Sequence, residues 1–180
     1  MKKLKLSATD LEDQKFNLID FSKTSLASHS FSQCVFDHCD FTESSWLNAR
    51  FWACTFRHCN ISLVKLKGCQ LQDVSFIECK IVGAEFFSCD TTLFFSINIT
   101  KSFVQYGNFS DLDMKKTMLQ GSTIHLSMFI NTNLVQTNFT HTDLQGTTFH
   151  NCDLTENSRL PIQINEKIVV SMHGKRLIPS

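Results

Sequence analysis

The sequence predicts an all-β solenoid, in which the chain coils through short extended segments joined by corners. The main observation is a large apolar residue at every fifth position across most of the 180 residues. A step of five spreads side chains around an α-helix and alternates them between the two faces of a long strand, so neither element can bury the series. A short extended segment followed by a turn can bury it, because each turn brings the next apolar residue back to the inside.

Two series of central residues carry this period, and every member is apolar in a chain that is 42% hydrophobic. The first series is Leu11, Phe16, Phe21, Leu26, Phe31, Phe36, Phe41, Trp46, Phe51, Phe56, Ile61, Leu66, Leu71, Phe76, Ile81 and Phe86. The second, in a shifted frame, is Phe94, Ile99, Val104, Phe109, Met114, Leu119, Ile124, Phe129, Leu134, Phe139, Leu144, Phe149 and Leu154. The residue two places before each centre points to the same side and is nearly always small, as expected for a second inward position.

Several repeats also carry a family resemblance. Those that show it best are Cys39-Asp40-Phe41, Thr132-Asn133-Leu134, Thr142-Asp143-Leu144 and Cys152-Asp153-Leu154. They resemble the pentapeptide-repeat motif, a small residue followed by Asp or Asn and then Leu or Phe, over roughly residues 6–158. The resemblance implies a right-handed quadrilateral β-helix with four pentapeptides per coil and about seven coils. Residues twenty apart should then stack, which predicts core ladders of Phe16, Phe36, Phe56 and Phe76, and of Phe109, Phe129 and Phe149.

The pattern divides the chain into four parts. Residues 1–10 are polar and form a lead-in or cap, 11–91 form a first stack of repeats, 92–158 a second stack, and 159–180 a C-terminal cap or pairing segment. Between Phe86 and Phe94 the spacing is eight residues, so a frame break is expected near residues 87–93. It is either a loop that the rod tolerates or a functional kink. The C-terminal segment contains two β-rich stretches, which predict two short strands.

The charge distribution, the lack of a long apolar run and the cysteine positions indicate the expected location and the state of the thiols. The formal net charge is zero, but residues 6–158 are acidic and both ends are basic. No apolar run is long enough to span a membrane, and no secretory signal is present, so the expected location is the cytoplasm. The eight cysteines all fall in register with the inward position two before a centre. They are therefore expected to be buried thiols and not a disulfide framework.

The sequence predicts no enzyme, cofactor or metal site. No nucleophile elbow, phosphate loop or zinc motif is present. The best metal candidate is the ladder of His38, His58 and Glu78, which are twenty residues apart. Each directly precedes an inward cysteine, and neighbours in an extended segment point to opposite sides, so thiol and imidazole cannot share one ion. Structural surface residues are the preferred interpretation.

Two binding functions remain open. The repeats are similar to those of Qnr-type quinolone-resistance proteins, which implies a DNA mimic that binds and protects DNA gyrase or topoisomerase IV. The candidate residues for this function are Asp10, Glu12, Asp13, Asp20, Asp37, Asp40 and Glu43. The alternative is an interaction scaffold with an unrelated protein partner, for which the candidates are the off-frame aromatics Phe87, Phe95, Phe103 and Tyr106. Neither function requires direct contact with nucleic acid or membrane, and a homodimer through residues 159–180 is a further alternative.

Overall fold

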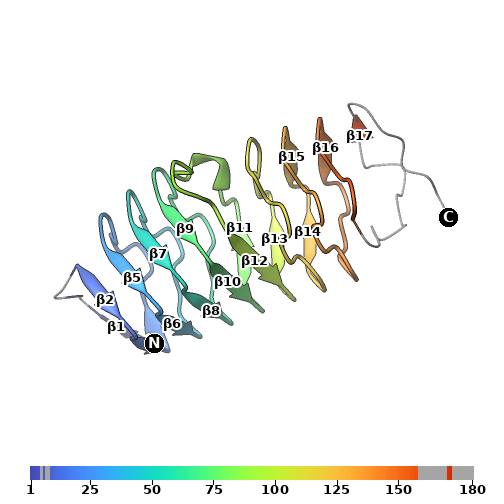
Figure 1. Ribbon diagram of the computed structural model, residues 1–180. Coiled ribbons are helices and arrows are strands. Elements are labelled where there is room, and N and C mark those ends of the chain that lie inside the picture. The colour runs from blue at the N-terminus through green and yellow to red at the C-terminus, as the bar shows by residue number, and fades with distance from the viewer. Residues whose placement is uncertain (5, 7–8, 158–169, 172–180) are drawn as a thin grey trace.

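The computed structural model describes residues 1–4, 6, 9–157 and 170–171, and it is a β-solenoid of about seven coils (Figure 1). Every strand pairs with its neighbour in parallel, one coil above the next. The elements are β1 (Lys2–Lys3), β2 (Asp10–Glu12), β3 (Lys15–Asn17), β4 (Ile19–Asp20), β5 (Ser30–Ser32), β6 (Val35–Asp37), β7 (Arg50–Trp52), β8 (Thr55–Arg57), β9 (Gln70–Gln72), β10 (Val74–Ile77), β11 (Lys80–Val82), the 3₁₀ turn η1 (Phe86–Ser88), β12 (Ile97–Thr100), β13 (Phe103–Gln105), β14 (Thr123–His125), β15 (Met128–Ile130), β16 (Thr148–His150) and β17 (Val170–Ser171).

Four faces run along the rod, and each is named here by one of its strands. The β2 face carries β2, β5, β7 and β9, and the β3 face carries β3, β6, β8, β10 and β12. The β4 face carries β1, β4, β11, β13 and β14, which isolated bridges such as Asp20↔Asp40 connect into one column. The β15 face carries η1, β15, β16 and β17. The quadrilateral β-helix expected from the sequence is therefore confirmed.

The corners explain why a five-residue period closes into a square coil. The residue two places after nearly every centre has a positive φ, between 50° and 62° where it is not glycine. A single residue in this left-handed conformation bends the chain sharply between one extended segment and the next. Few of these positions are glycine, so the parallel ladder on both sides of each corner, with its backbone hydrogen bonds, offsets the local conformational cost.

Stacked aromatic rings fill the core. The rings of Phe16 and Phe36 are 4.9 Å apart between centroids, those of Phe36 and Phe56 4.7 Å, and those of Phe56 and Phe76 5.1 Å. A second column continues from Phe86 to Phe109 (4.8 Å), Phe129 (4.7 Å) and Phe149 (5.0 Å). Each phenyl ring lies above the equivalent ring of the previous coil, because one coil adds a single strand spacing. Both ladders predicted from the sequence are buried.

The small inward residues satisfy backbone groups inside the core. Cys59 Sγ donates to the carbonyl oxygen of Phe36 at 3.4 Å, and Thr132 Oγ1 donates to that of Phe109 at 2.9 Å. All eight cysteines are buried and free. Burial raises the pKa of Cys54 to about 12, because a thiolate would lose its hydration there.

The frame break is an insertion of three residues close to the predicted position, but two aromatic residues beside it differ from the sequence prediction. Before it, residues stack with an offset of twenty, as in Phe56↔Phe76, whereas β10 and β12 pair with Phe76↔Ile99. Phe94, expected as the first centre of the second series, is 53% exposed. Phe95, expected on the surface, packs against the core instead. The reason is that residues 91–96 form no strand, and regular pairing resumes only at Ile97.

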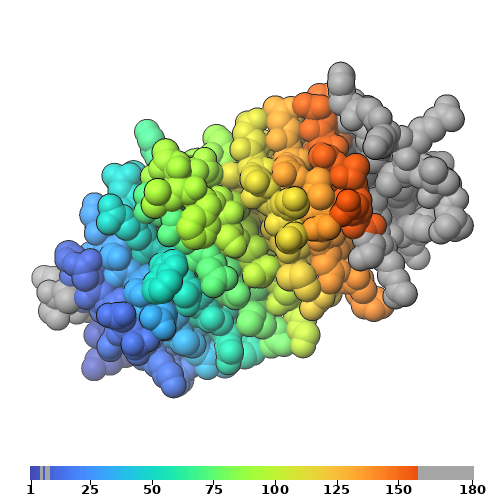
Figure 2. Space-filling model, in the orientation of Figure 1, coloured from blue at the N-terminus to red at the C-terminus, as the bar shows by residue number. Residues whose placement is uncertain are grey.

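The sheets continue across the insertion. β12 is hydrogen-bonded to β10 and β13 to β11, so the boundary proposed between residues 91 and 92 does not interrupt the ladder. The residues of the insertion gather on the surface of the rod (yellow-green in Figure 2). Gln70 Nε2 donates to Asp90 Oδ2 at 2.8 Å, which ties the start of the insertion to the coil before it.

Short strands lie on both ends of the stack. β1 pairs with β4 in the register Lys3↔Asp20, so part of residues 1–10 extends the β4 face. β17 pairs with β16 through Phe149↔Val170 and adds one strand from the segment 159–180. The remainder of that segment, including Pro161–Ile164 and 167–169 of the predicted strands, lies outside the described residues. Within the described part of the chain, no helix has the length and apolar character needed to cross a bilayer.

Candidate protein-binding surfaces

The acidic candidates surround the first two coils and do not form one stripe. Asp10 and Glu12 lie in β2, and Asp13 lies at the corner after it, all exposed on the β2 face. Asp20 and Asp40 are stacked on the β4 face, with Glu43 at its corner. Asp37 lies in β6 on the β3 face. The carboxylates therefore point outward from three of the four faces.

Two of these carboxylates also stabilise turns. Asp20 Oδ1 accepts hydrogen bonds from the hydroxyl of Ser22 at 2.5 Å and from its backbone nitrogen at 2.9 Å, and these bonds lower the pKa of Asp20. Asp40 makes the equivalent pair of bonds with Thr42. The Asp-x-Ser/Thr geometry needs an oxygen acceptor but not a charge, so the motif alone does not explain why these positions are acidic.

The negative charge is concentrated at one end of the rod. Residues 9–45 contain seven Asp or Glu against two Lys, a net charge of −5, and residues 46–157 contain nine against eight Lys or Arg, a net charge of −1. Lys2 and Lys3 in β1 lie beside the β4 face, so they reduce the negative charge near Asp20. The β2 face, with Asp10, Glu12 and Asp13, has no such compensation from β1.

The aromatic candidates lie on two adjacent faces. Phe87, in η1 on the β15 face, is 45% exposed, and Phe103, in β13 on the β4 face, is 39% exposed. Tyr106 is 57% exposed at the corner between these faces. These three side chains are accessible to a partner, whereas Phe95 packs against the core.

An apolar column that was not predicted from the sequence lies at the same corner. Leu63, Gly83, Tyr106, Leu126 and Gly146 occupy equivalent corner positions in successive coils, and each has a positive φ. The glycines make room for the leucines: a Cβ on Gly83 would lie 3.1 Å from Leu63 Cδ2, and one on Gly146 would lie 2.7 Å from Leu126 Cδ2. We call Leu63, Tyr106 and Leu126 the corner strip. A hollow beside it is lined by Leu63, Lys65, Lys67, Gly83, Glu85 and Phe87. The signal was present in the sequence as a spacing of twenty, lengthened by three across the insertion.

A polar cluster lies at the corner that follows β6 and β8. His38, His58 and Glu78 stack at equivalent positions with positive φ. The imidazole rings of His38 and His58 are 4.4 Å apart, and Asp37 joins them from the end of β6. The hydrogen bond to Asp37, together with that to Glu78, raises the pKa of His58, and the same bond to His58 lowers the pKa of Asp37. The sequence analysis did not connect Asp37 with this ladder.

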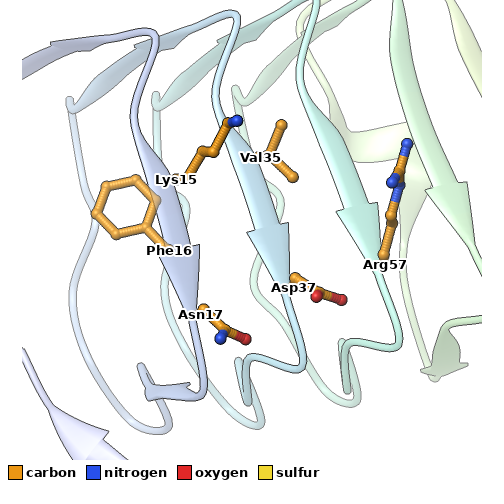
Figure 3. Close-up of a pocket in the computed structure, with 6 residues that line it drawn as sticks. All are labelled: Lys15, Phe16, Asn17, Val35, Asp37 and Arg57. Atoms are coloured by element: carbon orange, nitrogen blue, oxygen red, sulfur yellow. The ribbon is translucent and has the colours of Figure 1, made fainter.

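Asp37 also borders a hollow on the β3 face. Figure 3 shows the six residues that line it, which are Lys15, Phe16, Asn17, Val35, Asp37 and Arg57. The Arg57 side chain extends away from the Asp37 carboxylate in this view, although the two residues are on neighbouring strands. The carboxylate is therefore directed to the histidine corner and not to the arginine.

Two family models match the chain. The model "Pentapeptide repeat region" matches residues 29–102, and the model "Pentapeptide repeats (8 copies)" matches residues 127–156. The chain belongs to the pentapeptide-repeat family. Among curated proteins, none matches it.

Solved structures with a similar fold have low sequence identity. A trypsin-treated form of QnrB1, a plasmid-mediated fluoroquinolone resistance protein, is 18% identical, with 91% of this chain and 88% of that chain covered and a TM-score of 0.48. Full-length QnrB1 is 21% identical, covering 91% and 84%, with a TM-score of 0.45. A pentapeptide repeat protein from the Arabidopsis thaliana thylakoid lumen is 17% identical, covering 79% and 70%, with a TM-score of 0.32.

Proposed function

We propose that this pentapeptide-repeat protein is a cytoplasmic, non-enzymatic binding protein whose first two coils imitate DNA and occupy the DNA-binding surface of a type II topoisomerase. The observation that carries the proposal is the charge density at that end of the rod. Two coils extend about 10 Å at a spacing of about 4.8 Å per layer. Residues 9–45 place a net charge of −5 on them, or one charge per about 2 Å, and Lys2 and Lys3 of β1 reduce it to −3 on the side of the β4 face. B-DNA carries one negative charge per about 1.7 Å of axis.

The distribution of these charges around the rod supports the same proposal. A duplex presents phosphates on more than one side, and a concave DNA-binding surface contacts it from more than one direction. The carboxylates of Asp10, Glu12 and Asp13 point from one face, those of Asp20, Asp40 and Glu43 from a second, and that of Asp37 from a third. A rod with charge on three faces can be held by a curved basic surface, whereas a single acidic stripe would be contacted on one side only.

The choice of gyrase or topoisomerase IV as the partner rests on the similarity of the repeats to those of Qnr-type proteins. A binding role without catalysis agrees with the chemistry of the core. The cysteines, which would be the strongest nucleophiles of the chain, are buried, and burial raises the pKa of Cys54 and of Cys89 to about 12.

The test uses the exposed carboxylates of the β2 face. The variant Asp10→Asn, Glu12→Gln, Asp13→Asn removes three charges while keeping polar side chains of the same size. We expect it to bind purified gyrase or topoisomerase IV about tenfold more weakly than wild type in low salt. Wild-type affinity should fall steeply between about 0.05 and 0.3 M salt, as screening shortens the range of the field. A DNA duplex should compete for the same surface of the enzyme.

The matched control is Asp73→Asn, Glu85→Gln, Asp111→Asn, which removes three charges from later coils. It should bind as wild type does, and both variants should keep the wild-type melting temperature. If the two triple variants weaken binding equally, or if wild-type binding does not respond to salt, the first coils do not imitate DNA.

The corner strip favours a second candidate function, an interaction scaffold with an unrelated protein. Leu63 is 54% exposed, Tyr106 57% and Leu126 47%, and Phe87 lies nearby across the hollow. Such a partner would be held by apolar contact and would show little response to salt. Phe87→Ser with Tyr106→Ser should abolish that binding without affecting binding to a topoisomerase. Subunit pairing through residues 159–180 stays a prediction, which a mass measurement in solution tests.

A further inference from the structure

The polar cluster at the corner after β6 has the geometry of a metal site. Potential ligand atoms of Asp37, His38 and His58 all lie within 4.8 Å of one another. Asp37 Oδ1 is 2.9 Å from His38 Nδ1 and 3.1 Å from His58 Nδ1. Both imidazole nitrogens are thus directed at one point, which the carboxylate oxygen occupies.

Glu78 orients one of these rings. Its Oε2 atom is 2.7 Å from His58 Nε2 and accepts the proton of that nitrogen. With Nε2 donating to Glu78, metal binding would replace the hydrogen bond between His58 Nδ1 and Asp37 by a bond from the Nδ1 lone pair to the ion. Histidines that bind metals usually donate their other ring nitrogen to a carboxylate in this way, which fixes the ring and makes it a stronger ligand.

We propose that Asp37, His38 and His58 bind one divalent late transition-metal ion of the Zn²⁺ class, with Glu78 as the group that positions His58. Imidazole nitrogen with a carboxylate oxygen is a donor set that this class of ion prefers. Three protein ligands leave the fourth position of a tetrahedral ion open to water. Two carboxylates beside two neutral imidazoles balance the charge of the ion.

The movement required is small. Ligand atoms around a tetrahedral ion with bonds of about 2.0–2.1 Å lie about 3.3 Å from one another. Asp37 Oδ1 is already 2.9 Å and 3.1 Å from the two Nδ1 atoms, and the three ligand atoms lie within 4.8 Å of one another, so shifts of about 1 Å or less are sufficient. The side chains of His38 and His58 are 51% and 42% exposed, and that of Asp37 is 39% exposed. Rotation about their χ angles therefore meets little packing resistance. The ion would connect two successive coils, because Asp37 ends β6, His38 follows it, and His58 follows β8.

The experiment is a calorimetric titration of the full chain, stripped of metal with a chelator, with Zn²⁺ alone. We expect one ion per chain and a rise in melting temperature on binding, since an ion that binds only the folded state stabilises it. His58→Ala and His38→Ala should each weaken binding by at least about tenfold, and Glu78→Gln should weaken it by about 10–100-fold.

The matched control is His125→Ala. His125 Nε2 is 2.7 Å from Asp143 Oδ2, so this histidine also has a carboxylate partner, but among the residues that the structure describes it belongs to no group of three potential ligands. Its loss should leave Zn²⁺ binding unchanged. Co²⁺ in place of Zn²⁺ distinguishes the donors, because binding through the core cysteines would give a thiolate charge-transfer band and binding at the histidine corner would not. Binding that survives His58→Ala, that shows the thiolate band, or that is absent from wild type would each overturn the proposal.

Discussion

The replacement Phe56→Ala tests the stacked core most directly. Phe56 is fully buried, and its ring stacks on Phe36 at 4.7 Å and on Phe76 at 5.1 Å between centroids. Its ring also contacts Phe51 at 5.5 Å and Trp46 at 5.3 Å. Alanine would leave a cavity bounded by rings that the coils above and below hold in place. The surrounding rings cannot easily move in to fill this cavity. The loss of unfolding free energy should therefore lie at the upper end of the usual range for Phe→Ala, about 4–5 kcal/mol.

This cost is a large fraction of the total stability of a domain, which is about 5–15 kcal/mol. In a solenoid each coil contacts only its neighbours, so weakening the third coil affects the interfaces on both sides of it. Urea unfolding followed by far-UV circular dichroism measures the loss. Fluorescence of Trp46 reports on the same region, because the indole is fully buried next to Phe56.

Phe87→Ala is the control, since the same chemical change at a side chain that is 45% exposed should cost less than about 1 kcal/mol. Phe56→Asp should prevent folding, because it buries a charge without a partner. A loss below about 1 kcal/mol for Phe56→Ala, or a loss equal to that of Phe87→Ala, would contradict the inward position of this column.

Three further outcomes are expected. The eight thiols, all buried, should react slowly with a thiol reagent in native protein and rapidly in denaturant, as measured by the chromophore that the reagent releases. Gly146→Ala should destabilise more than Gly121→Ala at a similar φ, because the new Cβ would lie 2.7 Å from Leu126 Cδ2 at the first site and 3.5 Å from its nearest neighbour at the second; unfolding curves compare them. Hydrogen bonds from Gln70 and Thr92 lower the pKa of Asp90 to about 2, so this group stabilises the fold above its unfolded pKa of about 3.9. Asp90→Asn should therefore destabilise at pH 7, and the difference from wild type should shrink as the pH falls from about 4 to 2.

The fold was predictable because the period and the small inward residues leave one arrangement that buries the centres. The first buried centre after the insertion was not. Phe94 and Ile99 are both apolar and five residues apart, so spacing alone admits either as the first centre after the break. Which of the two is the first buried centre depends on the pairing of Val74 with Ile97, and local sequence does not determine this long-range register. The exposure of Phe94 and the packing of Phe95 against the core follow from it.

The candidate sites could be predicted from the sequence only by comparing residues that lie on the same face or at the same corner of successive coils. The corner strip and the histidine cluster both become visible when corner positions are compared at the spacing of one coil. Asp37 was predicted only as an acidic surface residue and was not linked to His38 and His58. In an extended segment, neighbours point to opposite sides. At a corner this rule fails: His38 has φ 51°, and the turn brings its ring to the side of the preceding Asp37.

The pentapeptide pattern also explains how one rod can carry separate surfaces. The centre and the residue two before it fill the core, so three of every five positions point outward and are free of packing constraints. Charge can then vary from coil to coil without disturbing the core, which is how residues 9–45 carry −5 while 46–157 carry −1. The carboxylates of the β2 face, the histidine corner and the corner strip use different outward positions, whereas Asp37 belongs both to the acidic coils and to the histidine corner. Substitutions in one of these surfaces should therefore leave the other two unchanged, and additive effects of combined variants on topoisomerase binding, Zn²⁺ binding and melting temperature would follow.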